Sequence, residues 1–185
     1  MTTALLIIDV QNAILENEGT PDRQPAIDAA LTETVGRLQS LQARARAAHI
    51  PVILVQHDGG PGDRLARSSH GWGLRHEIAP VPGETVVHKK ACDSFFQTDL
   101  QDELAKRSIT HLVIGGCMTQ FCVDTTVRRA VSLGYHVTLL SDGHATGDMG
   151  ELTFPQIIAH HNRLLSGFDA GAHHVELRRA NEISF

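Results

Sequence analysis

The strongest constraint on this chain is the alternation of short apolar runs with longer segments of helical periodicity. The apolar runs are nearly continuous, which is typical of parallel strands buried on both faces. The predicted strands cover residues 4–10, 51–56, 84–89, 111–116, 135–140 and 172–177. The predicted helices cover residues 25–48, 98–108, 119–133 and 153–166. This alternation indicates an α/β fold, because parallel strands need crossover connections that are usually helical.

The chain of 185 residues has the length of one domain and contains no repeat or linker, so we expect a single domain over residues 1–185. We predict a three-layer α/β/α architecture with a parallel sheet of about six strands, in the Rossmann-like order 3-2-1-4-5-6. This order would place the first and fourth strands side by side. Thr98 and Thr119 have the chemistry of helix N-caps, and Gly134 is placed to end the third helix.

Charge and composition argue against two classes of partner. The formal net charge is -5 and no basic block is present, which argues against nucleic acid. The first apolar run, from Ala4 to Ile8, is too short for a signal sequence or a membrane span. The chain has three cysteines, and an odd number argues against a disulfide framework. We therefore expect a cytoplasmic protein with free thiols and no membrane partner.

Candidate reactive residues follow three of the predicted strands. Asp9 ends the first strand, Lys89 and Lys90 end the third, and Cys117 and Cys122 follow the fourth. In an open parallel sheet, ligands bind beyond the carboxyl ends of the strands. Each residue alone has an ordinary structural explanation, as a turn former, a solvated lysine or an inert buried thiol. Their occurrence together at strand ends favours a functional site.

The three thiols differ in their predicted surroundings. Cys122 lies in the first turn of the helix that we expect to start at Thr119, where free N–H groups and the helix dipole would lower its pKa. Cys117 lies before that helix, and we interpret it as a structural turn residue. Cys92 is neither at a strand end nor at a helix start, so we also interpret it as structural. The sequence therefore predicts Cys122 as the nucleophile.

Three segments, in order, resemble the signature segments of the isochorismatase-like cysteine hydrolase superfamily. They are LLIIDVQN, VVHKKACDSFFQTDL and LVIGGCMTQFCVDTTVRRAVSLGY, and the resemblance extends over roughly residues 4–165. It implies a catalytic set of Asp9, Lys89 and Cys122, with the adjacent Lys90 as the alternative lysine. It also implies a cis peptide bond between Cys117 and Met118.

The resemblance further implies a reaction. The backbone N–H groups of Met118 and Cys122 would form the oxyanion hole, and Gly115 and Gly116 would let the backbone approach a substrate. The superfamily includes nicotinamidases, N-carbamoylsarcosine amidase and biuret hydrolase, so we expect hydrolysis of a C–N bond in a small amide, carbamoyl or ureido compound. The intermediate would be a thioester. Family members often form dimers or tetramers, so we also expect a homo-oligomer.

One family pattern is absent. Nicotinamidases carry a D-x-H metal segment after the second strand, whereas this chain has VQHDGG there. The pairs His160-His161 and His173-His174 also lack the spacing of a metal site. We therefore predict no metal and no cofactor, and we do not expect nicotinamide as the substrate. A Cys–His pair is the rival arrangement, and His57 is the histidine at a strand end.

The substrate pocket is predicted from residues near these motifs and from the long Gly/Pro-rich segment 57–83, which contains the only tryptophan. Core packing is an equally good explanation for the two phenylalanines. Asp142 and His144 follow the fifth strand and could either support the site or only form a turn. The candidate pocket residues are Gln11, His57, Trp72, Phe95 and Phe121.

An alternative function is a non-catalytic module that binds a ligand or senses redox state through a thiol. The intact set of Asp9, Lys89 and Cys122 favours the enzyme. A sensor would also need a device that couples thiol oxidation to a partner, and the sequence shows no such device.

Overall fold

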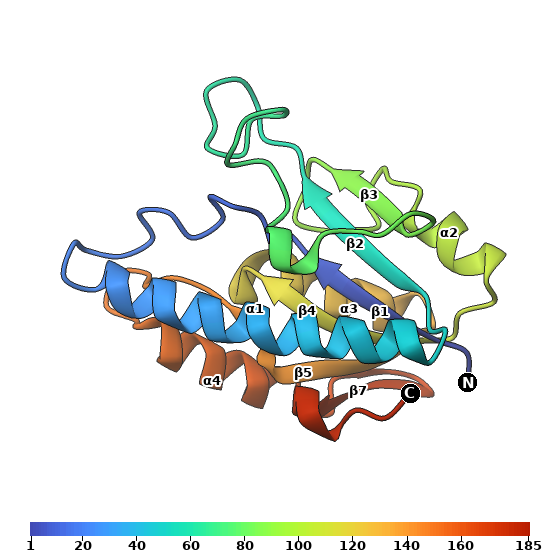
Figure 1. Cartoon of the computed structure of the whole chain (residues 1–185). Helices are drawn as coiled ribbons and strands as arrows, with labels where there is room; N and C mark the ends of the chain where they lie inside the picture. Colours follow the sequence, from blue (N-terminus) through green and yellow to red (C-terminus); the bar gives the residue numbers. More distant parts are fainter.

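The central strand β1, Thr3–Ile8, is buried on both faces, and its alternate side chains enter two different cores. Leu5 and Ile7 pack beneath helix α1, Gln24–Ala47, while Leu6 and Ile8 pack on the opposite face. The computed structural model describes residues 1–185 and shows α1 lying across one face of the sheet (Figure 1). Two apolar layers therefore enclose the sheet, as the continuous apolar runs predict.

The remaining elements complete the three layers. The other strands are β2 Val52–His57, β3 Thr85–Lys89, β4 His111–Cys117, β5 His136–Ala145, β6 Asp169–Ala170 and β7 His173–Arg178. The other helices are α2 Leu100–Lys106, α3 Asp124–Ser132 and α4 Phe154–Leu165. Three short helical turns are η1 His76–Ile78, η2 Thr119–Val123 and η3 Ala180–Glu182. Leucines of α2 and valines of α3 pack on the face of the sheet opposite α1, and the core on that face is called the second core.

The sheet has seven strands in the order β3-β2-β1-β4-β5-β7-β6. All pairs are parallel except β6 with β7, which is antiparallel. The predicted order is confirmed, since the sixth predicted strand is β7. The two-residue strand β6 was not predicted, because so short an edge strand carries no apolar pattern.

The register of the strands brings their carboxyl ends to one edge. Ile8 of β1 is level with Val55 of β2 and Gly116 of β4, and His57 of β2 is level with Lys89 of β3. The residues that follow Ile8, Lys89 and Gly116 therefore lie close together. This register brings the residues of the candidate site to one edge of the sheet.

Both glycines of β4 are required by close packing of the sheet. A Cβ on Gly116 would lie 2.0 Å from the backbone oxygen of Ile8, and one on Gly115 would lie 2.6 Å from that of Gly143. Gly116 also has a φ of 129°, which favours glycine. The expectation that these two glycines also let the backbone approach a substrate stays a prediction.

Two predicted N-caps are wrong by one or more positions. Helix α2 begins at Leu100, so Asp99 occupies the cap, although the Thr98 hydroxyl still accepts a hydrogen bond from the Leu100 N–H at 3.3 Å. Met118 occupies the cap of η2, and Thr119 is its first residue. Hydroxyl side chains near a helix start predict its position only to within a residue or two. Gly134 follows α3 with a φ of 92°, as its predicted role requires.

Strand β5 is longer than predicted and contains a register shift opposite Ile114 and Gly116 of β4. Asp142 and His144 therefore lie within this strand and not after it. The second half of this strand, SDGHA, was not predicted because it contains no continuous apolar run. Bulges of this kind commonly turn a side chain toward a functional site.

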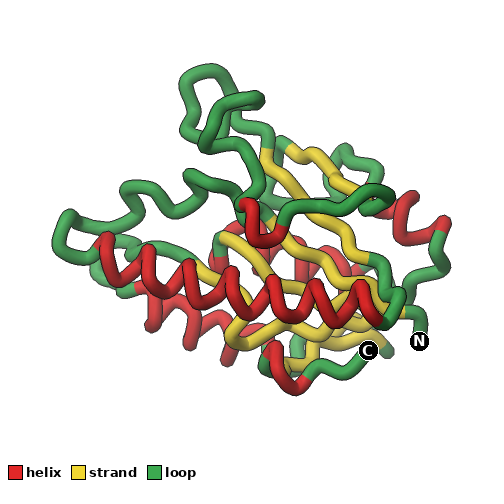
Figure 2. The backbone as a smooth tube through the Cα atoms, viewed as in Figure 1, coloured by secondary structure: helices red, strands yellow, loops and turns green.

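The segment between β2 and β3 extends beyond the sheet as a long loop, drawn in green in Figure 2. It is anchored at its middle, since the Trp72 backbone oxygen accepts hydrogen bonds from Gln11 Nε2 at 2.7 Å and Gln56 Nε2 at 2.8 Å. Leu74 also forms a bridge to Gln11. No helix combines the length and the apolar character that a membrane span needs.

Candidate active site

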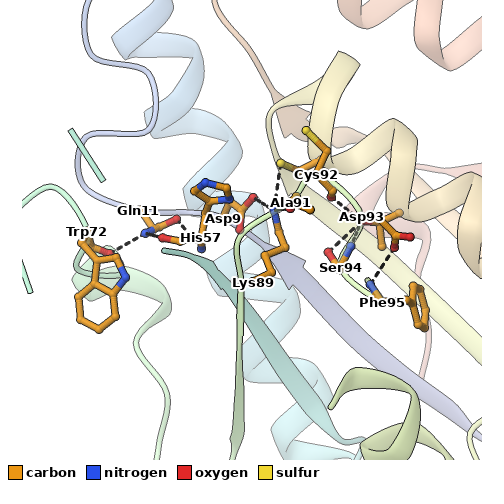
Figure 3. A network of polar contacts seen from close by, with 12 residues as sticks. Asp9, Gln11, His57, Trp72, Lys89, Ala91, Cys92, Asp93, Ser94 and Phe95 are labelled. Carbon is orange, nitrogen blue, oxygen red and sulfur yellow. Dashed lines mark hydrogen bonds and ion pairs between the residues drawn. The ribbon is translucent and has the colours of Figure 1, made fainter. Parts of the chain in front are cut away.

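Lys89 lies at the centre of a fully buried polar cluster at the carboxyl edge of the sheet. Its ammonium Nζ is 2.6 Å from Asp9 Oδ2, 3.1 Å from Cys122 Sγ and 2.9 Å from the backbone oxygen of Ala91. An ammonium has three donors, so these three acceptors satisfy it. The side chains of Lys89 and Asp9 are both 0% exposed. Figure 3 shows Lys89 reaching from its strand toward Asp9.

The backbone of Asp9 has a conformation that is uncommon for residues other than glycine. Its φ is 52°, in the left-handed region, and its N–H bonds to the Val55 backbone oxygen at 2.9 Å. This turn ends β1 at Ile8 and directs the carboxylate toward Lys89. Beyond the ion pair, neither carboxylate oxygen has a directed hydrogen bond within the chain. Such strain and incomplete pairing concentrate at functional sites.

The pKa values of the cluster shift together. Burial raises the pKa of Asp9 more strongly than Lys89 lowers it. Burial also raises the pKa of the Cys122 thiol, the Asp9 charge raises it further, and Lys89 opposes both. For Lys89, burial acts to lower the pKa, but Asp9 and Cys122 together raise it above its ordinary value. The resting cluster therefore contains a protonated Lys89 and a neutral Cys122 thiol.

This finding corrects the expectation that the helix start lowers the pKa of Cys122. The first turn, η2, is a π-helix, and the sulfur packs among apolar side chains of the second core. The cost of burying a thiolate beside the Asp9 carboxylate outweighs the helix dipole. A thiol in this position needs a neighbouring base to remove its proton, and the Asp9 carboxylate is next to it.

Met118 lies directly before η2, and Cys122 lies within it. The Cys117–Met118 peptide bond is cis, as the resemblance implies. The Met118 backbone oxygen accepts hydrogen bonds from the N–H groups of Phe121 and Val123. No hydrogen bond within the chain is donated by the Met118 N–H, so that group is available to a ligand.

Gln11 joins the ends of two strands to the long loop. Its Nε2 donates to the backbone oxygens of His57 at 3.0 Å and Trp72 at 2.7 Å, and its Oε1 accepts from the His57 N–H at 3.0 Å. Both amide protons are therefore used inside the protein. Gln11 shapes the site by holding His57 and Trp72, and Figure 3 shows it between them.

His57 lies beside Asp9 in Figure 3. Its Nδ1 is buried without a hydrogen bond. Burial lowers the pKa of His57, and the Lys89 charge lowers it further, so the ring is neutral at neutral pH. No hydrogen bond connects the ring to Cys122, so the structure does not form the rival Cys–His pair.

Trp72 is directed toward a second carboxylate, that of Asp58. Its Nε1 donates to Asp58 Oδ1 at 2.7 Å, and its ring stacks on His88 with centroids 5.7 Å apart. His88 Nδ1 is also 3.2 Å from Asp58 Oδ1. Asp58 and His88 border a groove of about 580 Å³ that also reaches Lys89, Lys90 and Phe96. We did not select His88 from the sequence. Successive side chains of a strand point to opposite faces of the sheet, so His88 faces away from the side to which Lys89 points.

The two phenylalanines of the predicted pocket have different surroundings. Phe95 is buried in the second core and stacks on Tyr135 with centroids 5.9 Å apart, which favours core packing, and its place in the pocket stays a prediction. Phe121, next to Cys122, is 40% exposed. It lies at the surface beside the nucleophile turn and remains a pocket candidate.

The other candidates differ in burial, and Cys117 is the last residue of β4 instead of a turn residue. Cys117 is buried among apolar residues, and burial raises its pKa to about 12. Cys92 is exposed, and no cysteine forms a disulfide. Lys90 is exposed, whereas Lys89 is the lysine that contacts Asp9. Asp142 accepts a hydrogen bond from the Ala180 N–H at 2.8 Å and supports the C-terminal segment.

No group of three His, Cys, Asp or Glu side chains has the arrangement of a metal site. A hollow of about 740 Å³ lies at the opposite edge of the sheet, near Thr3, His111 and Thr138. It contains none of the residues described above. The position of the charged cluster, and not the size of a hollow, therefore marks the candidate site.

Comparison with known proteins identifies the family of the chain. The isochorismatase domain model matches residues 3–154. A streptothricin hydrolase of Streptomyces noursei is 37% identical over 147 residues, which cover 79% of this chain and 50% of that protein. This chain thus spans about half the length of the streptothricin hydrolases that it matches. The ureidoacrylate amidohydrolase RutB of Methylobacterium radiotolerans is 30% identical over 176 residues, covering 79% of this chain and 68% of that protein.

The fold also matches a solved structure. An isochorismatase from Pseudomonas putida KT2440 superimposes with a TM-score of 0.85 at 26% identity, covering 99% of this chain and 90% of the other. The domain match, the relatives and the sheet order agree with one another. The chain therefore belongs to the isochorismatase family of hydrolases.

Proposed function

We propose that the protein hydrolyses the C–N bond of a small amide, carbamoyl or ureido compound, with Cys122 as the nucleophile. The observation that carries this proposal is the position of Lys89 Nζ, within 2.6 Å of Asp9 and 3.1 Å of Cys122, in a fully buried cluster. A carboxylate, an ammonium and a thiol in mutual contact supply a base, a stabilising charge and a nucleophile.

Proton transfer starts the reaction. Asp9 takes the thiol proton as the Cys122 sulfur attacks the substrate carbonyl carbon. Burial raises the pKa of Asp9, which makes the carboxylate a stronger base than an exposed aspartate. Lys89 retains its charge and stabilises the sulfur as negative charge develops there.

The tetrahedral intermediate carries an oxyanion that needs hydrogen-bond donors. We assign the Met118 N–H, which is not used within the chain, and the Cys122 N–H to this role. The intermediate collapses when the C–N bond breaks, and the leaving nitrogen takes the proton from Asp9. A thioester between Cys122 and the acyl group remains.

Water then completes the cycle. Asp9, now ionised again, takes a proton from water as the water oxygen attacks the thioester carbon. The C–S bond breaks, the sulfur recovers a proton, and the carboxylic or carbamic acid leaves. Each turnover therefore consumes one water molecule and releases one acid and one amine or ammonia.

The relatives support the choice of a C–N bond. RutB is named for hydrolysis of ureidoacrylate, a ureido compound, and the chain covers 68% of its length. The streptothricin hydrolases are larger proteins, so their substrate is a weaker guide. We therefore place ureido and carbamoyl compounds first among the candidates.

A screen of small amides, carbamates and ureido compounds for release of ammonia or amine tests the proposal. Cys122→Ala should abolish release, while Cys117→Ala, which changes a buried thiol outside the cluster, should retain it. Mass spectrometry of a quenched reaction should find an acyl group on Cys122. Activity that survives in Cys122→Ala and is lost in Cys117→Ala would refute the assignment.

A further inference from the structure

We propose that His144 and Thr119 form a positioning pair that holds the backbone of the oxyanion hole. The Thr119 hydroxyl and His144 Nδ1 are 2.9 Å apart, and Thr119 directly follows Met118. This inference rests on the proposed function, because it concerns the N–H group that would bind the oxyanion. Both are positioning residues, since neither contacts the reacting atoms.

The register shift in β5 brings His144 to this place. His144 is level with Gly116 and Ala145 with Cys117, immediately before the nucleophile turn. Thr119 and His144 are each only 1% exposed, so their hydrogen bond is shielded from water. The second half of β5 therefore supports the start of η2 through the contact between His144 and Thr119.

The direction of every hydrogen bond in this chain of contacts can be assigned. Asn162 Nδ2 donates to the Ser141 backbone oxygen at 2.9 Å, which orients Asn162 Oδ1 toward His144 Nε2 at 3.0 Å. His144 Nε2 must then carry the proton, and Nδ1 is the acceptor. The Thr119 hydroxyl therefore donates to Nδ1, and its oxygen has a fixed position.

The charge state of His144 is consistent with this assignment. Burial lowers the pKa of His144 to about 4, although the hydrogen bond that its ring donates to Asn162 acts in the opposite direction. His161 on α4 lowers it and Asp142 on β5 raises it. The ring is therefore neutral at neutral pH and keeps the Nδ1 lone pair that Thr119 needs.

The same sheet contains a matched control at its other end. His111 Nε2 lies 2.8 Å from the Thr138 hydroxyl, and Thr138 is buried like Thr119. This second histidine–threonine contact is at the amino ends of the strands. Thr138→Val thus removes the same kind of bond as Thr119→Val without touching the candidate site.

The experiment separates the oxyanion hole from the nucleophile. Iodoacetamide alkylates Cys122 without forming an oxyanion, so its rate measures the thiol alone. Acetaldehyde forms a hemithioacetal: the sulfur bonds to the carbonyl carbon, the C=O bond becomes single, and the thiol proton passes to the oxygen. The hydroxyl oxygen of the hemithioacetal accepts hydrogen bonds from the same N–H groups that would hold an oxyanion. Protection of Cys122 from iodoacetamide by acetaldehyde therefore measures these donors even where no turnover substrate is used.

Thr119→Val should lower kcat and weaken acetaldehyde protection by about ten- to a hundredfold, somewhat less than loss of a whole oxyanion-hole donor. Its KM and its alkylation rate without aldehyde should stay within about twofold of wild type. Thr119→Ser should restore both properties, and Thr138→Val should change neither. His144→Phe combined with Thr119→Val should cost no more than one of the two changes, because they remove the same bond.

Two failures can be told apart. If the wild type hydrolyses no amide but is protected by acetaldehyde, the proposed function fails, and the comparison of Thr119→Val with Thr138→Val still decides the positioning pair. If Thr119→Val equals Thr138→Val in both kcat and protection, the positioning pair is refuted while the function stands. A wild type that shows neither hydrolysis nor protection refutes both.

Discussion

Two carboxylates end neighbouring strands of this sheet, and their surroundings differ. Asp9, after β1, is fully buried, pairs with Lys89 and has no directed hydrogen bond from any other group. Asp58, after β2, accepts a hydrogen bond from Trp72 Nε1 at 2.7 Å and lies 3.2 Å from His88 Nδ1. Its further ionic neighbour, Arg67, is 3.6 Å away and largely exposed.

The difference separates a reactive group from a structural one. Asp58 accepts a hydrogen bond from Trp72 Nε1 and lies close to His88 Nδ1, so it holds Trp72 and the long loop in place. Asp9 has a buried charge, a raised pKa and free acceptor capacity, which are the properties of a base. Equal residue types at equal positions in two strands thus acquire different roles from their partners.

The largest expected effect tests this contrast directly. Asp9→Asn keeps the shape of the side chain but removes the base, and it should lower kcat by about 10²–10⁴-fold. Asp58→Asn should keep kcat within about threefold, because its partners do not touch the thiol. Steady-state kinetics on the best amide of the screen measures both. Equal losses in the two variants would contradict the separation of roles.

Lys89→Met should have the next largest effect, on stability. It leaves the buried Asp9 charge without its partner, which typically costs about 3–5 kcal/mol. Alkylation of Cys122 at neutral pH should also slow, since the charge that favours the thiolate is lost. Urea unfolding and iodoacetamide kinetics measure the two effects. Arg67→Ala is the control, and a similar loss of stability there would show that exposed charges at this edge matter as much.

A smaller loss of stability is expected for Trp72→Phe. The change removes the indole donor to Asp58 but keeps an aromatic ring against His88, and a hydrogen bond to a charged group contributes about 1.5–3 kcal/mol. Proteolysis of the 57–83 loop should accelerate in parallel. If urea unfolding shows no change, Asp58 does not stabilise the loop through Trp72.

The smallest expected difference is in the pH dependence. Catalysis needs ionised Asp9, and a raised pKa means that this carboxyl keeps its proton to a higher pH than the ordinary 3.8. Activity should therefore fall as the pH is lowered through an apparent pKa above 3.8. The pH profile of kcat/KM measures this limb, which should be unchanged in Asp58→Asn. A limb at or below the ordinary aspartate value would argue against Asp9 as the base.

Much of the fold follows from local pattern. The continuous apolar runs of β1, β2 and β4 predicted a parallel sheet covered on both faces, and its strand order is as expected. The second half of β5 was missed, because its residues Ser141, Asp142 and His144 are polar, and the buried His144 is held by hydrogen bonds. Periodicity detects the hydrophobic pattern and carries no information on such polar networks.

The site shows the same division. The positions of Asp9, Lys89 and Cys122 at or near strand ends indicated that they could meet, since register aligns the carboxyl ends of parallel strands. For Phe95 the sequence left two explanations open, because a phenylalanine near a motif fits a core as well as a pocket, and its contact with Tyr135 is visible only in the structure. The partner of Thr119 lies 25 residues away and could not be inferred from spacing.

The sequence by itself determined which side chains stand at the carboxyl ends of the strands, because alternation and apolar runs fix the strands locally. It also determined that Cys122 lies in the first turn after β4. Only the tertiary structure decided the acidity of that thiol: burial and the Asp9 charge raise its pKa, although the helix start alone would lower it. Proton affinity depends on the surroundings in three dimensions, and those surroundings come from strands that are distant in the chain.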